Sequence, residues 1–210
     1  AIVGSTGSGK STVAKLLLRF HDATKGAIRL DGVDLRELSQ DEIRGHIAYV
    51  PQKAWLFSGT VASNLRFGNE DATETDMLHA LEVAQSTFVL DQPQGLDTPV
   101  AQGGTNVSGG QRQRLAIARA IIRKPDVYIF DDSFSALDFK TDAALRHALQ
   151  DETRDAAVLI IAQRISTILH ADQIVVLKDG EVVGLGPHGE LMETCEVYRA
   201  IAESQMKGGE

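Results

Sequence analysis

The fold is decided by GSTGSGKST, residues 4–12. Four of its residues fit the pattern G-x-x-x-x-G-K-[ST], which needs a strand before it and a helix after it. The apolar tripeptide 1–3 is typical of the end of a strand. The residues that follow place apolar side chains on one face of a helix, at Val13, Leu16, Leu17 and Phe20.

This context predicts a phosphate-binding loop. Glycines such as Gly4, Gly7 and Gly9 allow successive backbone N–H groups to turn towards phosphate oxygens, and the start of a helix favours an anion. Lys10 offers a positive charge to the β- and γ-phosphates, and Ser11 offers a hydroxyl to Mg²⁺. A flexible glycine-serine turn would match the pattern by chance in only about 1% of chains of this length. We therefore expect nucleotide binding.

The composition is that of an ordinary globular domain. The 210 residues are 43% hydrophobic and carry a formal net charge of −8, which leaves no basic excess for nucleic acid or an anionic lipid surface. A single cysteine, Cys195, excludes an internal disulfide and suits a reducing compartment. The longest apolar run, AAVLIIA (156–162), is far shorter than the roughly 20 residues that span a bilayer. We expect no nucleic-acid partner, and a membrane connection only through other segments or chains.

Short apolar runs alternate with helical patterns along the chain. HIAYV (46–50), VYIF (127–130) and AAVLIIA (156–162) predict buried strands, and AIRLDGVDL (27–35) predicts a β-hairpin around an Asp-Gly turn. Buried strands separated by helices indicate a mainly parallel sheet covered on both faces, with ligands at the carboxyl ends of the strands. Four polar residues follow such strands: Lys10, Gln52, Asp131 and Gln163.

Residues 72–125 have a helical pattern instead. TDMLHALEVAQSTFVL (75–90) places Leu78, Leu81 and Phe88 on one stripe, and GGQRQRLAIARAIIR (109–123) continues as a helix until Pro125. We predict a helical subdomain over 72–125, inserted in a core formed by 1–71 and 126–210. The tail KGGE (207–210) is expected to be disordered.

Three segments taken together carry a resemblance to a known family. VSGGQ (107–111), RQRLAIARAI (112–121) and VYIFDDSFSALD (127–138) resemble the nucleotide-binding domain of ATP-binding cassette proteins, and the similarity covers essentially the whole chain. The resemblance implies a P-loop NTPase (RecA-like) α/β fold: a mainly parallel sheet core with an N-terminal antiparallel β portion and an inserted α-helical subdomain. It implies ATP and Mg²⁺ as cofactors. It also implies a head-to-tail pair of domains, in which each ATP lies between the phosphate loop of one and the signature motif of the other.

The resemblance assigns roles to individual residues. The segments are Walker A at 4–11, the signature at 107–111, Walker B at 127–131 and the D-loop at 135–138. The implied nucleotide-binding residues are Ser5, Thr6, Gly7, Ser8, Gly9, Lys10, Ser11 and Thr12. The implied Mg²⁺ ligands are Ser11, Gln52 of the Q-loop and Asp131 of Walker B, and the implied catalytic residues are Asp132, Gln52 and Gln163 of the switch position. Contact with the partner's ATP falls to Ser108, Gly109, Gly110 and Gln111, and the D-loop residues are Ser135, Ala136, Leu137 and Asp138. An N-cap role for Ser108 is compatible with this use.

The segment QKAWLFSGTVASNLRFG (52–68) indicates a branch of the family. It resembles the exporter-type segment that receives a transmembrane domain, although core packing of Trp55 and Phe57 is the alternative. Soluble cassette ATPases of repair or chromosome organisation carry a coiled-coil insertion between phosphate loop and signature, whereas Lys10 and Ser108 are only 98 residues apart here. Translation-type members have strongly basic surfaces, and a run of arginines like that at 112–123 is more often a solvated helix face. We prefer an exporter domain at the cytoplasmic face of a membrane, bound to transmembrane domains.

Two residues depart from the family at the catalytic centre. The family typically has glutamate at the position of Asp132 and histidine at that of Gln163. The aspartate carboxylate falls back by about 1.5 Å, and a misplacement of that order can cost around 10²-fold in rate. Gln163 can donate a hydrogen bond but cannot carry a proton.

These departures predict that the ATP site of this chain hydrolyses slowly. They also predict that its signature motif completes the ATP site of a second, non-identical domain. The alternatives are a homodimeric exporter with an aspartate base and a soluble ABC ATPase. Because AIV (1–3) is only the tail of a strand pattern, we expect the chain to be a piece of a longer polypeptide. In this family the aromatic residue that stacks on adenine lies upstream of the position of Ala1.

Overall fold

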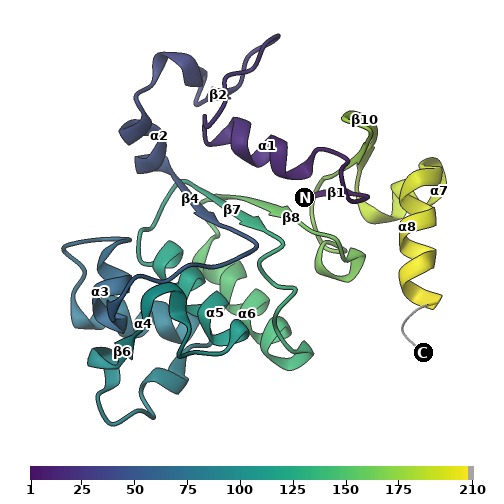
Figure 1. Ribbon diagram of the computed structural model, residues 1–210. Helices are drawn as coiled ribbons and strands as arrows, with labels where there is room; N and C mark the ends of the chain where they lie inside the picture. Colours follow the sequence, from purple (N-terminus) through teal and green to yellow (C-terminus); the bar gives the residue numbers. More distant parts are fainter. Residues whose placement is uncertain (208–210) are drawn as a thin grey trace. The chain divides into compact units, whose positions relative to one another are not determined.

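The structure is a computed structural model that describes residues 1–207 (Figure 1). The strands are β1 (Ile2–Gly4), β2 (Arg29–Leu30), β3 (Val33–Asp34), β4 (Ile47–Val50), β5 (Gly59–Thr60), β6 (Pro99–Val100), β7 (Val127–Asp131), β8 (Ala157–Ile161), β9 (Ile174–Lys178) and β10 (Glu181–Gly186). The α-helices are α1 (Lys10–Leu17), α2 (Gln40–His46), α3 (Val61–Arg66), α4 (Glu74–Val83), α5 (Gly109–Ile121), α6 (Phe139–Glu152), α7 (His188–Thr194) and α8 (Glu196–Lys207). Short 3₁₀ turns are η1 (Leu35–Glu37), η2 (Thr87–Val89), η3 (Gly95–Asp97), η4 (Gln102–Gly104) and η5 (Ile165–Thr167). Lys207 ends α8, and the rest of the tail predicted to be disordered, 208–210, lies outside the described residues.

The main sheet has six strands in the order β10-β9-β1-β8-β7-β4. Strand β1 is parallel to both of its neighbours, so that Ile2 lies opposite Ile161 of β8 and Val175 of β9. Strand β10 is antiparallel to β9. The prediction of an α/β fold around a mainly parallel sheet is confirmed.

The predicted hairpin is present but short. Strands β2 and β3 pair antiparallel around Asp31 and Gly32, whose φ angles are 48° and 83°. Positive φ at both central residues is what a two-residue type I′ turn requires, and Asp-Gly is among the sequences that accept it best.

Burial along the strands differs from the prediction at one place. Tyr128, Ile129 and Phe130 of β7 are buried, as expected. Strand β8, by contrast, begins with two exposed residues, Ala157 and Val158, so the prediction of a buried strand over 156–162 is wrong for its first part. A continuous apolar run shows that a strand can be buried, but it does not show how much of the strand other elements cover.

The chain divides into two compact units, which we describe separately. Unit 1 comprises residues 1–47, 129–132 and the chain from 159 onward, and unit 2 comprises 48–128 and 133–158. These bounds differ from the predicted core of 1–71 and 126–210 with an insert at 72–125, which stays a prediction. No helix within residues 1–207 is long and apolar enough to cross a membrane.

The core of unit 1 joins its sheet strands to the C-terminal helices. Helices α7 and α8 lie side by side (Figure 1), and α8 packs against β9 and η5. Their apolar faces meet the sheet in one cluster: Val3, Ala162, Ile165, Ile168, Ile174, Val176, Leu191, Cys195, Tyr198 and Ala202. Cys195 is a buried free thiol in this cluster.

Helix α5 forms the centre of unit 2. Most of its residues from Leu115 to Ile121 are buried, and it packs against α3 and α4. Gln113 on the same helix is 3% exposed, and its Nε2 donates to the carbonyl of Pro51 at 3.1 Å. This bond fixes the end of the segment that leads from β4 to Gln52.

Two helices end earlier than predicted. Helix α1 stops at Leu17 because Arg19 has φ 50°, and the N–H of Phe20 then donates to the carbonyl of Lys15 at 2.8 Å, which is a Schellman ending. Phe20 is therefore outside the helix and 56% exposed. The predicted apolar face of α1 does not include it.

Helix α4 likewise stops at Val83, and Gln85 has φ 54°. Phe88 therefore lies in the turn η2 rather than on the helix. The predicted stripe of Leu78, Leu81 and Phe88 is therefore wrong for Phe88, whereas Leu78 and Leu81 lie on the helix. The buried residues of α4 are Met77, Ala80, Leu81 and Val83.

Candidate nucleotide site

The glycine-rich loop between β1 and α1 has a backbone that only glycine accepts easily. Gly7 and Gly9 have φ angles of 84° and 104°, in the left-handed region. A Cβ on Gly4 would lie 2.3 Å from the carbonyl oxygen of Leu177. Inside the loop the N–H of Ser8 donates to the carbonyl of Ser5 at 3.1 Å.

The predicted nucleotide-binding residues all lie on this loop and the first turn of α1. Ser5, Thr6, Gly7, Ser11 and Thr12 are exposed, whereas Ser8 is 2% exposed. Gly9 is the N-cap of α1 and supplies no side-chain bond to the first N–H groups of the helix. Such uncapped N–H groups at a helix start can bind an anion.

Lys10 extends across the loop. Its Nζ donates to the carbonyls of Gly4 at 2.7 Å and Ser5 at 2.8 Å. Burial lowers the pKa of Lys10, and the negative charges of Asp132 and Asp131 act in the opposite direction. Unit 1 thus brings the lysine of the phosphate loop within electrostatic range of both carboxylates that end β7.

The two carboxylates differ in their surroundings. Asp131 is the last residue of β7 and is only 7% exposed. Asp132 follows with φ 49°, and its N–H donates to the carbonyl of Ile161 at 2.7 Å. Gln163, just after β8, donates from Nε2 to Oδ2 of Asp132 at 3.0 Å. The two residues that depart from the family pattern are therefore hydrogen-bonded to each other.

Ser108 in unit 2 is the N-cap of α5. Its hydroxyl accepts from the N–H of Gln111 at 3.2 Å, and Oε1 of Gln111 accepts from the N–H of Ser108 at 3.0 Å. This capping box stabilises the helix start. Ser108 and Gly109 are exposed, and a Cβ on Gly109 would meet nothing within 4 Å.

The D-loop lies beside this helix start. A Cβ on Gly110 would be 3.3 Å from the carbonyl oxygen of Ala136. Ser135 and Ala136 are exposed and Leu137 is 9% exposed. Asp138 is the N-cap of α6. Its carboxylate accepts a hydrogen bond from the N–H of Thr141, and this bond lowers the pKa of Asp138.

Gln52, predicted as a metal ligand and catalytic residue, also belongs to unit 2, where it is exposed.

Three aromatic rings in 52–68 are exposed, and we call these three residues together the aromatic face. Trp55, Phe57 and Phe67 are 52%, 41% and 60% exposed. The alternative, in which Trp55 and Phe57 pack in the core, is therefore wrong. The ring centroids of Phe57 and Phe67 are 4.4 Å apart. Asn64 binds both the N–H and the carbonyl of Phe57 at 2.8 Å, which fixes the backbone that carries this exposed ring.

The arginines of α5 are not a solvated helix face, so that prediction is wrong. Arg112 donates to the carbonyl of Gly104 at 3.2 Å. Arg114 lies over the ring of Phe88 at 5.0 Å, and burial lowers its pKa. Arg119 donates to the carbonyl of Trp55 at 2.9 Å, and burial lowers its pKa too. These guanidinium groups bind loops of their own unit.

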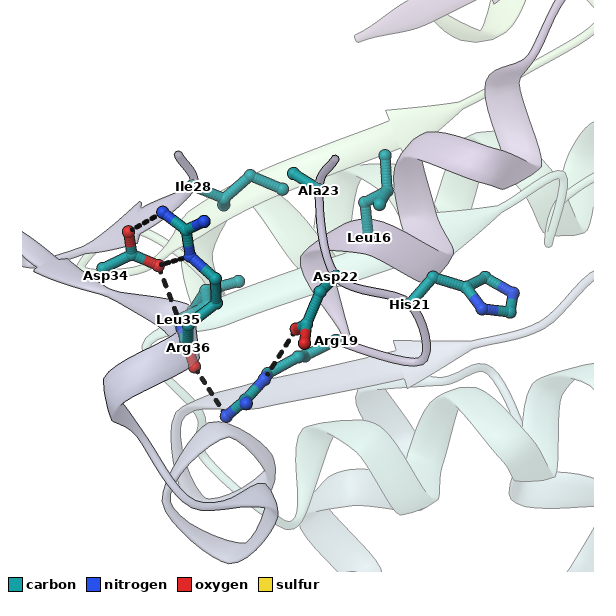
Figure 2. A pocket seen from close by; sticks show the side chains of 9 residues that line it. All are labelled: Leu16, Arg19, His21, Asp22, Ala23, Ile28, Asp34, Leu35 and Arg36. Atoms are coloured by element: carbon teal, nitrogen blue, oxygen red, sulfur yellow. Dashed lines mark hydrogen bonds and ion pairs between the residues drawn. The ribbon is translucent and has the colours of Figure 1, made fainter. Parts of the chain in front are cut away.

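A small pocket at the other end of α1 is separate from the phosphate loop (Figure 2). Arg19 pairs with Asp22 at 3.0 Å, and Arg36 pairs with Asp34 at 2.7 Å. The hydrogen bonds from Arg36 lower the pKa of Asp34 to about 2. Because both arginines already have carboxylate partners, we do not assign a ligand to this pocket.

Known proteins match both the sequence and the fold. Residues 1–135 match the family described as ABC transporter. An uncharacterized ABC transporter ATP-binding protein of Mycobacterium tuberculosis is 50% identical over 208 residues, which are 98% of this chain and 36% of that protein. The ATP-dependent lipid A-core flippase of Photobacterium profundum is 42% identical over 98% of this chain and 35% of its own length. ATP-binding cassette sub-family B member 6 of Rattus norvegicus is 38% identical over 100% of this chain and 25% of its own length.

A solved structure of a bacterial Atm1-family ABC exporter with ATP bound is also similar. Its TM-score is 0.94 at 35% identity, over 97% of this chain and 36% of that one. The P-loop, the sheet and these similarities define an ATP-binding domain with the fold of the ABC class. The chain belongs to the ABC transporter family, and it spans between a quarter and about a third of the length of these relatives.

Proposed function

We propose that this chain is the nucleotide-binding domain of an exporter that binds Mg-ATP but hydrolyses it slowly at its own phosphate loop. Its signature motif completes the site of a second, non-identical domain, where most hydrolysis takes place. The observation that carries the proposal is the 3.0 Å hydrogen bond from Gln163 to Asp132. The bond joins the Asp132 carboxylate to a side-chain amide, which can donate a hydrogen bond but cannot take up or pass on a proton.

Geometry and chemistry act in the same direction at this site. The aspartate carboxylate stands about 1.5 Å further back than that of a glutamate, and its bonding partner is an amide with no proton to exchange. Both effects reduce proton abstraction from an attacking water, whereas neither removes the lysine or the loop that bind the phosphates. Binding without rapid hydrolysis follows.

The oxygen ligands available in unit 1 suit Mg²⁺. The Ser11 hydroxyl and the Asp131 carboxylate are hard oxygen donors, and Mg²⁺ commonly binds one or two protein oxygens together with phosphates and water. No group of three or more His, Cys, Asp or Glu residues that could hold a metal is found in the described part of the chain. Ser11 and Asp131 would hold the ion together with the nucleotide, and the ion would neutralise charge on the β- and γ-phosphates.

The preserved signature supports catalysis at the partner's site. The capping box of Ser108 and Gln111 presets the start of α5, and Gly109 leaves open space in front of it. Backbone N–H groups fixed before the reaction are the type of donor that stabilises charge developing on a transferred phosphoryl group. The second domain would supply the glutamate and the histidine that this chain lacks.

The aromatic face supports attachment to transmembrane domains. Neighbouring exposed aromatic side chains mark interaction sites more often than single ones do. One relative of this chain is named as a flippase. A similar solved structure is that of an exporter. We propose that the face binds cytoplasmic segments of such domains, which places the chain at the cytoplasmic face of a membrane.

The proposal is tested by following the nucleotide at each site of the assembled transporter. ATP labelled on the α-phosphate is bound, one turnover is allowed, and the label held by this chain is analysed as ATP or ADP. We expect intact ATP at the phosphate loop of this chain and ADP at the partner's loop. Lys10→Ala is the control, because it removes the label at this chain's loop only. Equal conversion to ADP at both loops would refute the slow site.

A further inference from the structure

The last described turns of α8 touch the loop that carries Gln163. The side-chain amide of Gln205 makes two hydrogen bonds to that loop. Its Nε2 donates to the carbonyl of Gln163 at 2.7 Å, and its Oε1 accepts from the N–H of Ile165 at 2.8 Å. One side chain thus binds the backbone on both sides of Arg164.

The amide is carried on a well-anchored helix face. Tyr198, Ala202 and Gln205 are spaced i, i+4 and i+7, which places them on one side of α8. Tyr198 and Ala202 are 0% and 1% exposed and belong to the same core cluster as Ile165. Gln205 itself is exposed and continues this side of the helix with a polar side chain.

The loop has a local need for this contact. Ile165 begins the turn η5, and its N-cap residue, Arg164, supplies no side-chain bond. The first N–H groups of such a turn need acceptors from elsewhere. Gln205 provides one of them from 40 residues away in the sequence.

We infer that Gln205 is a positioning residue for the nucleotide site. By fixing the backbone of Gln163, it sets where the Gln163 amide can meet both the Asp132 carboxylate and the γ-phosphate of bound ATP. The C-terminal helix thereby sets how well the site distinguishes ATP from ADP. This inference rests on the role that the family resemblance implies for Gln163 at the switch position, which is contact with the γ-phosphate.

Two measurements test the inference on matched variants. Gln205→Met keeps a long unbranched side chain and good helix propensity but removes both hydrogen bonds. Glu203→Met, at an exposed position of the same helix, is the control, and Gln163→Ala is the reference for loss of the switch side chain. The first measurement is hydrogen exchange of the Ile165 amide in the nucleotide-free 210-residue chain. The second is the ratio of the ADP and ATP dissociation constants at the phosphate loop of this chain.

We expect Gln205→Met to speed exchange of the Ile165 amide by about 2- to 13-fold, the range for one neutral hydrogen bond. The ADP-to-ATP ratio should fall by a similar factor in Gln205→Met, and by about 10- to 100-fold in Gln163→Ala, which loses a bond to a charged group. Glu203→Met should change neither quantity.

The outcomes separate the inference from the function on which it rests. If Gln163→Ala lowers the ratio and Gln205→Met does not, the positioning role is refuted while the switch role stands. A Gln205→Met chain that weakens ATP and ADP equally has only a structural defect, which also refutes the inference. An unchanged exchange rate of the Ile165 amide in Gln205→Met would also refute the inference, and this measurement needs no nucleotide. An unchanged ratio in Gln163→Ala would overturn the switch role itself, and the inference with it.

Discussion

Restoring the two family residues in this chain should turn its own phosphate loop into an active site. The perturbation is the double substitution Asp132→Glu with Gln163→His. The glutamate carboxylate advances by about 1.5 Å, and histidine can carry a positive charge where glutamine cannot. The 3.0 Å bond from the Gln163 amide to the carboxylate is also removed.

The size of the gain follows from these changes. Correct placement of a reacting group by about 1 Å is worth around 10²-fold, and a positioned general base contributes about 10²- to 10⁴-fold. We therefore expect hydrolysis at this site to rise by at least about 10²-fold. Asp132 has φ 49°, a region that aspartate tolerates better than most residues, so the variant should lose at most about 1–2 kcal/mol of stability.

The assay is ATP turnover of the assembled transporter in which the partner's own phosphate-loop lysine is replaced. Only the site of this chain then contributes to the signal. The thermal midpoint of each variant is measured alongside, so that misfolding is not mistaken for inactivity. A folded double variant whose turnover stays within about threefold of the parent would refute the reasoning about Asp132 and Gln163.

Three further predictions concern binding, packing and attachment. Lys10→Ala should weaken ATP binding at this chain's loop by at least about 10-fold, the value of one hydrogen bond to a charged group, as measured by calorimetry. Gly68→Ala places a Cβ 2.3 Å from the carbonyl of Arg119 and should lower the free energy of unfolding by about 1–3 kcal/mol, whereas Gly45→Ala, with nothing within 4 Å, should leave it unchanged or raise it; a denaturant titration compares the two. Phe67→Asp should abolish co-purification with the transmembrane domains and leave ATP binding intact, and retained co-purification would exclude the aromatic face as the attachment surface.

The parts of the fold with strong local signals could be predicted from the sequence. The strand, loop and helix around Lys10 follow from glycine placement and apolar spacing, and the N-cap role considered for Ser108 is present in the structure. The ends of α1 and α4 could not be predicted. Both stop at non-glycine residues with positive φ, Arg19 and Gln85, which carry no glycine signal for a helix end.

Contacts over long sequence distances were also invisible in the sequence. Arg119 binds the carbonyl of Trp55 from 64 residues away, and Gln205 binds the Gln163 loop from 42 residues away. No local pattern marks a glutamine on a helix as the partner of a distant backbone. The exposure of Phe67 could be suspected only from its place at the end of 52–68.

The measurement that decides which of the two sites hydrolyses ATP is the turnover of the assembled pair with single substitutions in this chain. Ser108→Arg adds bulk and removes an N-cap worth about 0.5–2 kcal/mol, so its folding and partner binding are checked separately. Loss of one preorganised donor typically costs about 10²- to 10³-fold. We therefore predict that Ser108→Arg nearly abolishes turnover and that Asp132→Asn leaves it almost unchanged. If Asp132→Asn proves the more damaging of the two, the working site belongs to this chain, and a homodimeric exporter with an aspartate base is the correct description.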